Sequence, residues 1–591
     1  MGSITGLDFP LILCLIGAAA AGATIHSRRI VYLLGRHGPA LSPAFLLIVW
    51  YCFLWLGEYS GSLLGMGLSA ALALSAMAVL AVKTSRKRRL RPARWSWLDR
   101  AVYLFISFCL FALPLYDIVT HVSLLATVRR GNVPPCAYND PAFPMVYHAL
   151  YTTSGAYLSK AFAFSADLSL HLAAVILLFG IVCALQAVSR LLFKGEESAQ
   201  AARVFFLLGY GPVYFNPRKL DDLEDIWAGL SGSPFVEAIS RPPQILNFLI
   251  LLFLLGVLLP RLPASDDAPR ETAPDPLLLL PALLILPQAS EELTCLTALF
   301  LIGLAAARRL TPAWTGLSLA LMLVSACAGG VFKAYLGGKA PMTVPQILFA
   351  WPPLMISWSG NAPLLSWKGL STIFYEWGPI LFSALAPAWR DRRRRVCVLA
   401  FAVCFLVASL FRTGDVWNAP DFDRFLFVGT ALGFLVTAVW IERIEQARLA
   451  GRLSPLRSQL LSGALYAFVI VGQLGCMGFR LAGSSVGLRA FIEQFHAPVS
   501  GLDASLRAVG PQDQILTDSK MVGPLIEHGY IVVAPMAKYS AVGAADMGAF
   551  DDYVRDFHGR PSWYFLPEKD PRVSDRAIQG AYKSYILVKA G

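Results

Sequence analysis

The sequence contains few charged residues for its length, and fewer acidic than basic ones. Only 15% of its 591 residues are charged, whereas 56% are hydrophobic. A soluble domain needs a more polar surface, so this composition excludes the soluble classes and predicts a polytopic membrane protein. The 50 basic residues exceed the 38 acidic ones. Because the basic residues gather in short loops between apolar runs, the excess indicates membrane topology and no nucleic-acid partner.

The sequence also lacks the marks of a cleaved signal peptide and of a repeat protein. The apolar run 9–23 has no basic residue before it and no clear cleavage site, so we expect a retained first helix. No repeat of 20–50 residues is evident, which excludes solenoids and propellers. What remains is a mainly α-helical bundle.

Apolar runs long enough to cross a bilayer predict about 12–14 transmembrane helices. They lie near residues 9–25, 42–57, 61–82, 98–116, 165–192, 203–216, 244–260, 277–289, 293–307, 312–330, 371–389, 396–411, 424–441 and 458–482. The runs 277–289 and 293–307 are short enough to form one bent hairpin instead of two spans.

Basic loops predict the orientation. The linkers 83–94 and 390–395 are rich in Lys and Arg, which cytoplasmic loops retain because moving these charges across a membrane is unfavourable. Because successive helices cross the membrane in opposite directions, each remaining loop is then assigned to one side. The inner side receives the basic positions at 28–29, 194, 308–309 and 443–452. The outer side receives the loops 117–160, 217–242, 331–370 and 412–423 and everything after about residue 485.

The last hundred residues differ in character from the rest. Short β-rich runs near 514–518, 530–534, 563–566 and 584–588 alternate with helical or turn-like stretches. This pattern predicts a transmembrane domain over 1–484 and a small extracytoplasmic α/β domain over 485–591, with an accessory role. The domain has no glycine-rich phosphate loop. Cys136 is the only cysteine in a major outer loop, so no disulfide framework is expected there.

The outer loop 117–160 opens with an acid at the membrane surface. Asp117 directly follows the run 98–116, and His121 lies one helical turn further on. A carboxylate there could act as a general base toward an acceptor hydroxyl, with the imidazole orienting it. Asp is also a favoured helix N-cap, and 118–130 has the charges of a short interfacial helix. Both interpretations stay open, since a cap can also be catalytic.

Later positions in the same loop are candidate substrate ligands. Asp140 lies in an Asn-Asp-Pro turn sequence, for which a plain turn is the simpler reading. His148 precedes a stretch rich in Tyr, Ser and Thr, where an aromatic membrane belt is the alternative explanation.

Two further outer loops carry charge patterns suited to phosphate or metal. Asp221 and Asp222 begin a run of four acids in five positions, which could hold Mg²⁺ or Mn²⁺, although acids also favour a helix start. Arg412 and Arg424 bracket a short loop. Their guanidinium groups suit a phosphate, and an ion pair with Asp421 or Asp423 is the plainer reading. The loop 331–370 reads as an interfacial or re-entrant segment.

These features together resemble the GT-C glycosyltransferases. The resemblance rests on many predicted helices, a first major outer loop that begins with an acidic residue, and a predicted C-terminal extracytoplasmic domain. Its residues are Asp117–His121, Arg130–Pro135, Tyr147–Leu150 and Asp423–Phe425. Two departures are evident: several helices precede the acidic loop, and no Asp-x-Asp motif lies beside Asp117.

The resemblance implies an inverting hexosyl- or pentosyltransferase of the inner membrane, with its C-terminal domain on the periplasmic side. The donor would be a polyprenyl-phosphate sugar and the acceptor a glycan, a lipid or a protein. Asp117 would be the catalytic base, Arg412 or Arg424 would bind the donor phosphate, and His121, Asp140 and His148 would contact substrate. The alternatives are a lipid or solute transporter or flippase, and an O-antigen polymerase or ligase, which uses a diphosphate donor.

Overall fold

The computed structural model describes most of the helical bundle and most of the C-terminal domain. The described residues are 37–60, 95–112, 118–130, 132, 136–137, 140–144, 149–162, 164, 166–210, 235, 242–262, 276–328, 347–349, 351, 353–355, 362–385, 391–413, 423–483, 501–518, 520–521, 524–525, 528–533 and 561–590.

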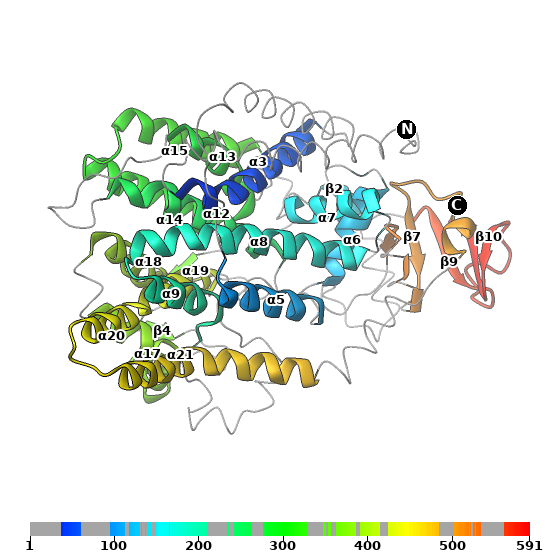
Figure 1. Cartoon of the computed structure of the whole chain (residues 1–591). Helices are drawn as coiled ribbons and strands as arrows, with labels where there is room; N and C mark the ends of the chain where they lie inside the picture. Colours follow the sequence, from blue (N-terminus) through cyan, green and yellow to red (C-terminus); the bar gives the residue numbers. More distant parts are fainter. Residues whose placement is uncertain are drawn as a thin grey trace, which may run out of the picture.

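The described residues form a mainly α-helical bundle with a small sheet domain beside it (Figure 1). Its helices are α3 (Gly38–Ser60), α5 (Trp97–Ala112), α6 (Ile118–Arg129), α7 (Ala149–Phe162), α8 (Ala166–Leu192), α9 (Glu196–Leu208), α12 (Pro242–Leu258), α13 (Leu280–Ala289), α14 (Glu291–Ala306), α15 (Pro312–Ala328), α17 (Trp367–Leu385), α18 (Arg392–Leu410), α19 (Asp423–Thr437), α20 (Val439–Leu449) and α21 (Pro455–Gly483). Two 3₁₀ turns, η3 (Leu259–Arg261) and η4 (Pro276–Leu279), extend α12 and precede α13.

Four stretches of helix within the described residues are long and apolar enough to cross a membrane. They are Leu168–Leu192, Gln244–Arg261, Phe425–Leu449 and Pro455–Gly475. Each coincides with a run predicted from hydropathy. The predicted runs 9–25 and 61–82 lie outside the described residues, so the total number of spans stays a prediction.

Helix α8 forms the centre of the bundle and packs against α3, α7 and α12. Close approach is possible because Gly180 presents no side chain. A Cβ at Gly180 would lie 2.6 Å from Cδ1 of Leu47 in α3 and 2.8 Å from Cδ1 of Leu249 in α12. Such contact distances are well below the normal spacing of packed carbon atoms, so a larger residue at 180 would separate these helices.

One predicted span is corrected by the structure. The run 203–216 was expected to cross the membrane, but the helix here is α9, which covers 13 residues and ends at Leu208. It begins earlier than the apolar run because Glu196 and Glu197 occupy its first turn, where the helix dipole favours acids. At about 1.5 Å per residue, α9 is too short to cross a bilayer.

The short runs 277–289 and 293–307 form two separate helices, α13 and α14, which meet at Ser290. Ser290 has an extended backbone with φ −162°, and its hydroxyl accepts a hydrogen bond from the Leu293 N–H at 3.0 Å. The extended backbone at Ser290 separates the two helices, and its hydroxyl caps the start of α14, a position at which serine is preferred.

The described basic segments meet at one end of the bundle. Arg393 at the start of α18 donates to the carbonyl oxygens of Leu191 and Leu262, and Arg394 forms a 2.7 Å ion pair with Glu442 of α20. Arg448 pairs with Glu197 of α9 at 2.9 Å. The assignment of these segments to one common side is consistent with these contacts, and we refer to this end as the basic end. Which side of the membrane it faces stays a prediction.

The C-terminal domain lies at the opposite end, beyond α21 (Figure 1). Its elements are α23 (Leu502–Ser505), β7 (Gln514–Thr517), β8 (Ile531–Val533), β9 (Trp563–Pro567), β10 (Ile578–Tyr582) and β11 (Tyr585–Lys589). The sheet order is β10-β11-β9-β7-β8, with β7 parallel to both neighbours and the other pairs antiparallel. A small C-terminal sheet is thus present, and its exposed edge strand β10 was not predicted.

Three short two-stranded sheets are described in the segments predicted to be outer loops, and one of them joins two such segments. They are β1 (Cys136–Ala137) with β2 (Asp140–Pro144), β3 (Ile347–Phe349) with β6 (Phe411–Thr413), and β4 (Leu354–Met355) with β5 (Ala362–Pro363). The segment 331–370, predicted to be interfacial or re-entrant, therefore contains strands where it is described.

Candidate functional site

Most of the predicted site residues fall where side chains are not described. Asp117, His148, Asp221 and Asp222 lie outside the described residues, and Asp140, Arg412 and Arg424 are described by their backbone alone. Their roles stay predictions, and the convergence of their side chains on one cavity is not tested. Their backbone neighbourhoods can nevertheless be compared.

The structure describes the elements that carry or adjoin several of these residues. Helix α6 begins at Ile118, directly after Asp117 in the sequence. Arg424 is the second residue of α19, which leads into α20 and the basic end. Arg412 lies in β6, where its backbone pairs with Leu348 of β3.

His121 is held against the neighbouring helix. Its Nδ1 lies 3.3 Å from the hydroxyl oxygen of Thr152 in α7. The two helices approach closely because a Cβ at Gly155 would lie only 2.9 Å from Leu125 Cδ1. The imidazole, predicted to orient a base or contact substrate, therefore also fixes the first turn of α6 to the bundle.

The other end of α6 is fixed to the C-terminal domain, which sequence reasoning did not foresee. Arg130 is half-buried, and its Nη2 donates to the carbonyl oxygen of Val509 at 3.1 Å. The guanidinium carbon lies 3.8 Å from the centre of the Tyr530 ring, a close cation–π contact. The planar guanidinium makes both contacts at once, which an ammonium group does less well.

Asn132 adds a second attachment to the same domain. Its side chain is 4% exposed; Nδ2 donates to the carbonyl oxygen of Pro511 at 3.0 Å, and Oδ1 accepts from Gln512 Nε2 at 2.9 Å. Both ends of this buried amide are therefore satisfied by the C-terminal domain. Arg130 and Asn132, which belong to the motif Arg130–Pro135, serve here as structural anchors.

An acid and a histidine extend the Arg130 contact into the domain. The Tyr530 hydroxyl donates to Asp503 Oδ1 at 3.1 Å, and His528 Nδ1 lies 3.0 Å from Asp503 Oδ2. The hydrogen bond from His528 is the main cause that lowers the pKa of Asp503, and burial raises the pKa of Tyr530 to about 12. We call Arg130, Asn132, Asp503, His528 and Tyr530 the Arg130 junction.

The junction predicts an acid-sensitive docking of the domain. A carboxyl whose pKa is lowered by folding adds stability above its ordinary pKa of 3.8, and that stability is lost as the pH falls through the folded value. We expect the domain to loosen from α6 below a pH of about 4. The loosening should be modest, because the Asp503 side chain is largely exposed. Pulsed hydrogen exchange over residues 501–533, at pH 3 to 7, measures this. An Asp503→Asn variant with an unchanged acid profile would contradict it.

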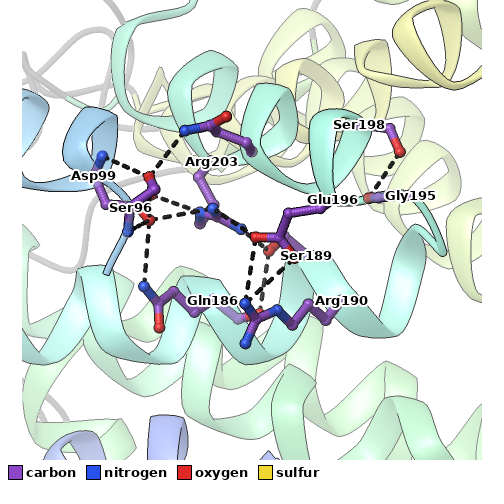
Figure 2. A network of polar contacts seen from close by, with 10 residues as sticks. Ser96, Asp99, Gln186, Ser189, Arg190, Gly195, Glu196, Ser198 and Arg203 are labelled. Atoms are coloured by element: carbon purple, nitrogen blue, oxygen red, sulfur yellow. Dashed lines mark hydrogen bonds and ion pairs between the residues drawn. The ribbon is translucent and has the colours of Figure 1, made fainter. Parts of the chain in front are cut away.

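A separate polar network lies nearer the basic end (Figure 2). Arg203 of α9 and Asp99 of α5 form an ion pair, with Nε 2.6 Å from Oδ1 and side chains 2% and 3% exposed. Arg203 Nη1 also donates to the Ser189 hydroxyl of α8 at 3.3 Å. Gln186 of α8 lies 3.4 Å from Asp99 Oδ2. The network therefore joins three helices.

The same carboxylate caps its own helix. The backbone N–H and the hydroxyl of Ser96 donate to Asp99 Oδ2 at 3.0 and 2.8 Å, and the Asp99 N–H donates back to the Ser96 hydroxyl at 3.1 Å. This reciprocal pattern is a capping box. Both carboxylate oxygens are engaged by protein groups, so we assign Asp99 and Arg203 a structural role.

Metal ligands were predicted at Asp221 and Asp222, which lie outside the described residues. Within the ranges that the structure describes, no group of three or more His, Cys, Asp or Glu side chains could hold a metal ion. The metal therefore stays a prediction.

Comparisons with known proteins give a weak structural similarity. No protein-family model matches the sequence, and no curated protein matches it. The structure is similar to the crystal structure of the Archaeoglobus fulgidus oligosaccharyltransferase, tethered through a disulfide bond to an acceptor peptide containing the NVT sequon. The match covers 80% of this chain and 69% of the other, with 12% identity and a TM-score of 0.36. A TM-score this low establishes neither a common fold nor an activity.

Proposed function

We propose that the chain is an integral-membrane glycosyltransferase. It would move a sugar from a polyprenyl-phosphate donor to a glycan, lipid or protein acceptor outside the membrane. The observation that carries the proposal is the position of α6. This helix, whose first residue follows Asp117, packs against α7 of the bundle and against the C-terminal domain. In this proposal, the acid next to the start of α6 meets a donor anchored in the bilayer and an acceptor held outside it.

The proposed reaction is an inverting displacement at the anomeric carbon. The acceptor hydroxyl oxygen forms the new glycosidic bond while the Asp117 carboxylate takes its proton. The bond between the anomeric carbon and the phosphate oxygen breaks, and the bonding electrons leave with the polyprenyl phosphate. Arg412 or Arg424 would stabilise the charge on that phosphate through paired N–H donors.

The remaining predicted residues have supporting roles in this proposal. His121, Asp140 and His148 would contact the sugar or the acceptor, and His121 would also hold α6 against Thr152. A Mg²⁺ or Mn²⁺ ion at Asp221 and Asp222, when bound, would neutralise part of the donor phosphate charge.

The described buried charges favour this proposal over a transporter. Transport sites are built from polar groups exposed within interrupted helices near the middle of the membrane. Here Asp99 and Glu292 occupy the first turns of α5 and α14, and each is bonded to a neighbouring serine. Arg203 is paired with Asp99. Among the described residues, these charges therefore serve helix caps and helix packing.

Removal of the gene tests the proposal. The deletion strain is expected to lose one envelope glycan modification and to accumulate its polyprenyl-phosphate sugar, because the donor is no longer consumed. Mass spectrometry of lipid carriers and of glycans measures both. Accumulation of a diphosphate-linked oligosaccharide would contradict the proposed donor and favour a polymerase or ligase. Unchanged glycans and carriers would contradict glycosyl transfer altogether.

A further inference from the structure

We propose that the C-terminal domain positions the outer loop 117–160 for sugar transfer, and that Arg130 is the positioning residue. This inference rests on the proposed function, since it concerns the placement of Asp117. It assigns the domain, predicted to be accessory, a direct part in the geometry of the loop.

Helix α6 needs support at both ends. It has only 12 residues, and isolated helices shorter than about 12–15 residues are marginal in water. Its orientation must therefore come from packing. His121 and Leu125 contact α7 at its first and middle turns, and Arg130 contacts the C-terminal domain at its end.

The C-terminal domain packs tightly against the end of α6. Gly529 of the C-terminal domain has a φ of +80°, and a Cβ there would clash with the carbonyl oxygen of Ala126 and lie 3.0 Å from Cδ of Arg130. Glycine alone combines this backbone conformation with so close an approach. The domain thus touches the α6 backbone directly and is not merely tethered through α21.

A second segment of the loop 117–160 also contacts the C-terminal domain. Strand β2, which begins at Asp140, lies beside β8, the strand that follows Tyr530. The domain therefore contacts both α6, which follows Asp117, and the strand that begins at Asp140. A shift of the domain would move both predicted site residues together, and a displacement of about 1 Å can lower a rate roughly 100-fold.

The test uses four variants of the full chain in lipid nanodiscs. Arg130→Ala removes the Arg130 contacts with Val509 and Tyr530, Arg130→Lys keeps only the charge, and Gly529→Ala introduces a clash with the Ala126 carbonyl oxygen. Arg129→Ala is the matched control, because Arg129 is the exposed neighbour at the end of the same helix. Hydrogen exchange over residues 118–132 reports docking. Release of polyprenyl phosphate from polyprenyl-phosphate sugars, extracted from membranes of the source organism and mixed with acceptor-containing membranes, reports kcat and donor KM.

Arg130→Ala and Gly529→Ala are expected to speed exchange in α6 and to lower kcat about 10–100-fold, with donor KM nearly unchanged. Arg130→Lys should fall between them and the wild type, and Arg129→Ala should match the wild type. Faster exchange with an unchanged kcat would overturn the positioning role, and unchanged exchange would show that the Arg130 junction does not hold α6 against the C-terminal domain. Failure of the proposed function is distinguishable, because the wild type would then release no polyprenyl phosphate while the exchange results stand.

Discussion

Replacing Arg203 with leucine is expected to lower the free energy of unfolding of the bundle by about 3–5 kcal/mol. The guanidinium is 2% exposed and satisfies the buried carboxylate of Asp99. Leucine fills part of the space but leaves that carboxylate without its charged partner. A buried charge that loses its partner is costly, because neither water nor another charge replaces the interaction.

The matched control is Arg190→Leu, which removes the same charge from neighbouring α8. Arg190 is 39% exposed and pairs with Glu196, so its loss should cost roughly 0–1 kcal/mol. Denaturant unfolding in detergent micelles measures both variants. The double variant Asp99→Asn/Arg203→Leu should recover part of the loss, because the unpaired charge is gone while an amide remains near Ser96. Equal stability of the two arginine variants would show that the ion pair does not hold the three helices together.

Replacing Asp117 with asparagine is expected to lower the rate of sugar transfer about 10²–10⁴-fold, with little change in donor KM. The amide has nearly the same size but cannot accept the proton of the acceptor hydroxyl. Asparagine is also as good an N-cap as aspartate. The start of α6 should therefore survive, which separates the catalytic interpretation from the capping one.

Asp117→Ala completes this comparison, since alanine can neither cap nor accept a proton. It should lose activity to the same extent and also destabilise the start of α6 by about 1 kcal/mol. Hydrogen exchange over 118–124 and a turnover assay measure the two effects separately. Full activity in Asp117→Asn together with loss in Asp117→Ala would mean that Asp117 is only a cap.

Much of the bundle follows from apolar runs, because a membrane-spanning helix must satisfy its backbone internally and face lipid or protein with apolar side chains. The runs 165–192 and 244–260 correspond closely to α8 and α12. Helix ends were harder to predict. The run 424–441 missed the extension through α20, since its polar residues, such as Glu442 and Arg448, meet other helices and not the bilayer.

The contacts between distant segments were not predictable from spacing. Arg130 and Val509 are separated by 379 positions, and Asp99 and Arg203 by 104. The sequence did hold a signal for Asp99 and Arg203, because an acid and an arginine in otherwise apolar surroundings each require a partner. For Arg130, the sequence indicated an outer loop rich in charge but held no sign of which surface would receive it. The charge pattern therefore predicted which loops share one side of the membrane but not what these loops contact.

The most direct test of glycosyl transfer is made with purified protein in liposomes that contain polyprenyl-phosphate sugars from the source membranes. Acceptor-containing membranes are added, and mass spectrometry follows the bond between sugar and phosphate. The wild type is expected to convert the lipid-linked sugar to free polyprenyl phosphate and glycosylated acceptor, whereas Asp117→Asn is not. Movement of the intact lipid-linked sugar between the two leaflets, with no loss of that bond, would contradict glycosyl transfer.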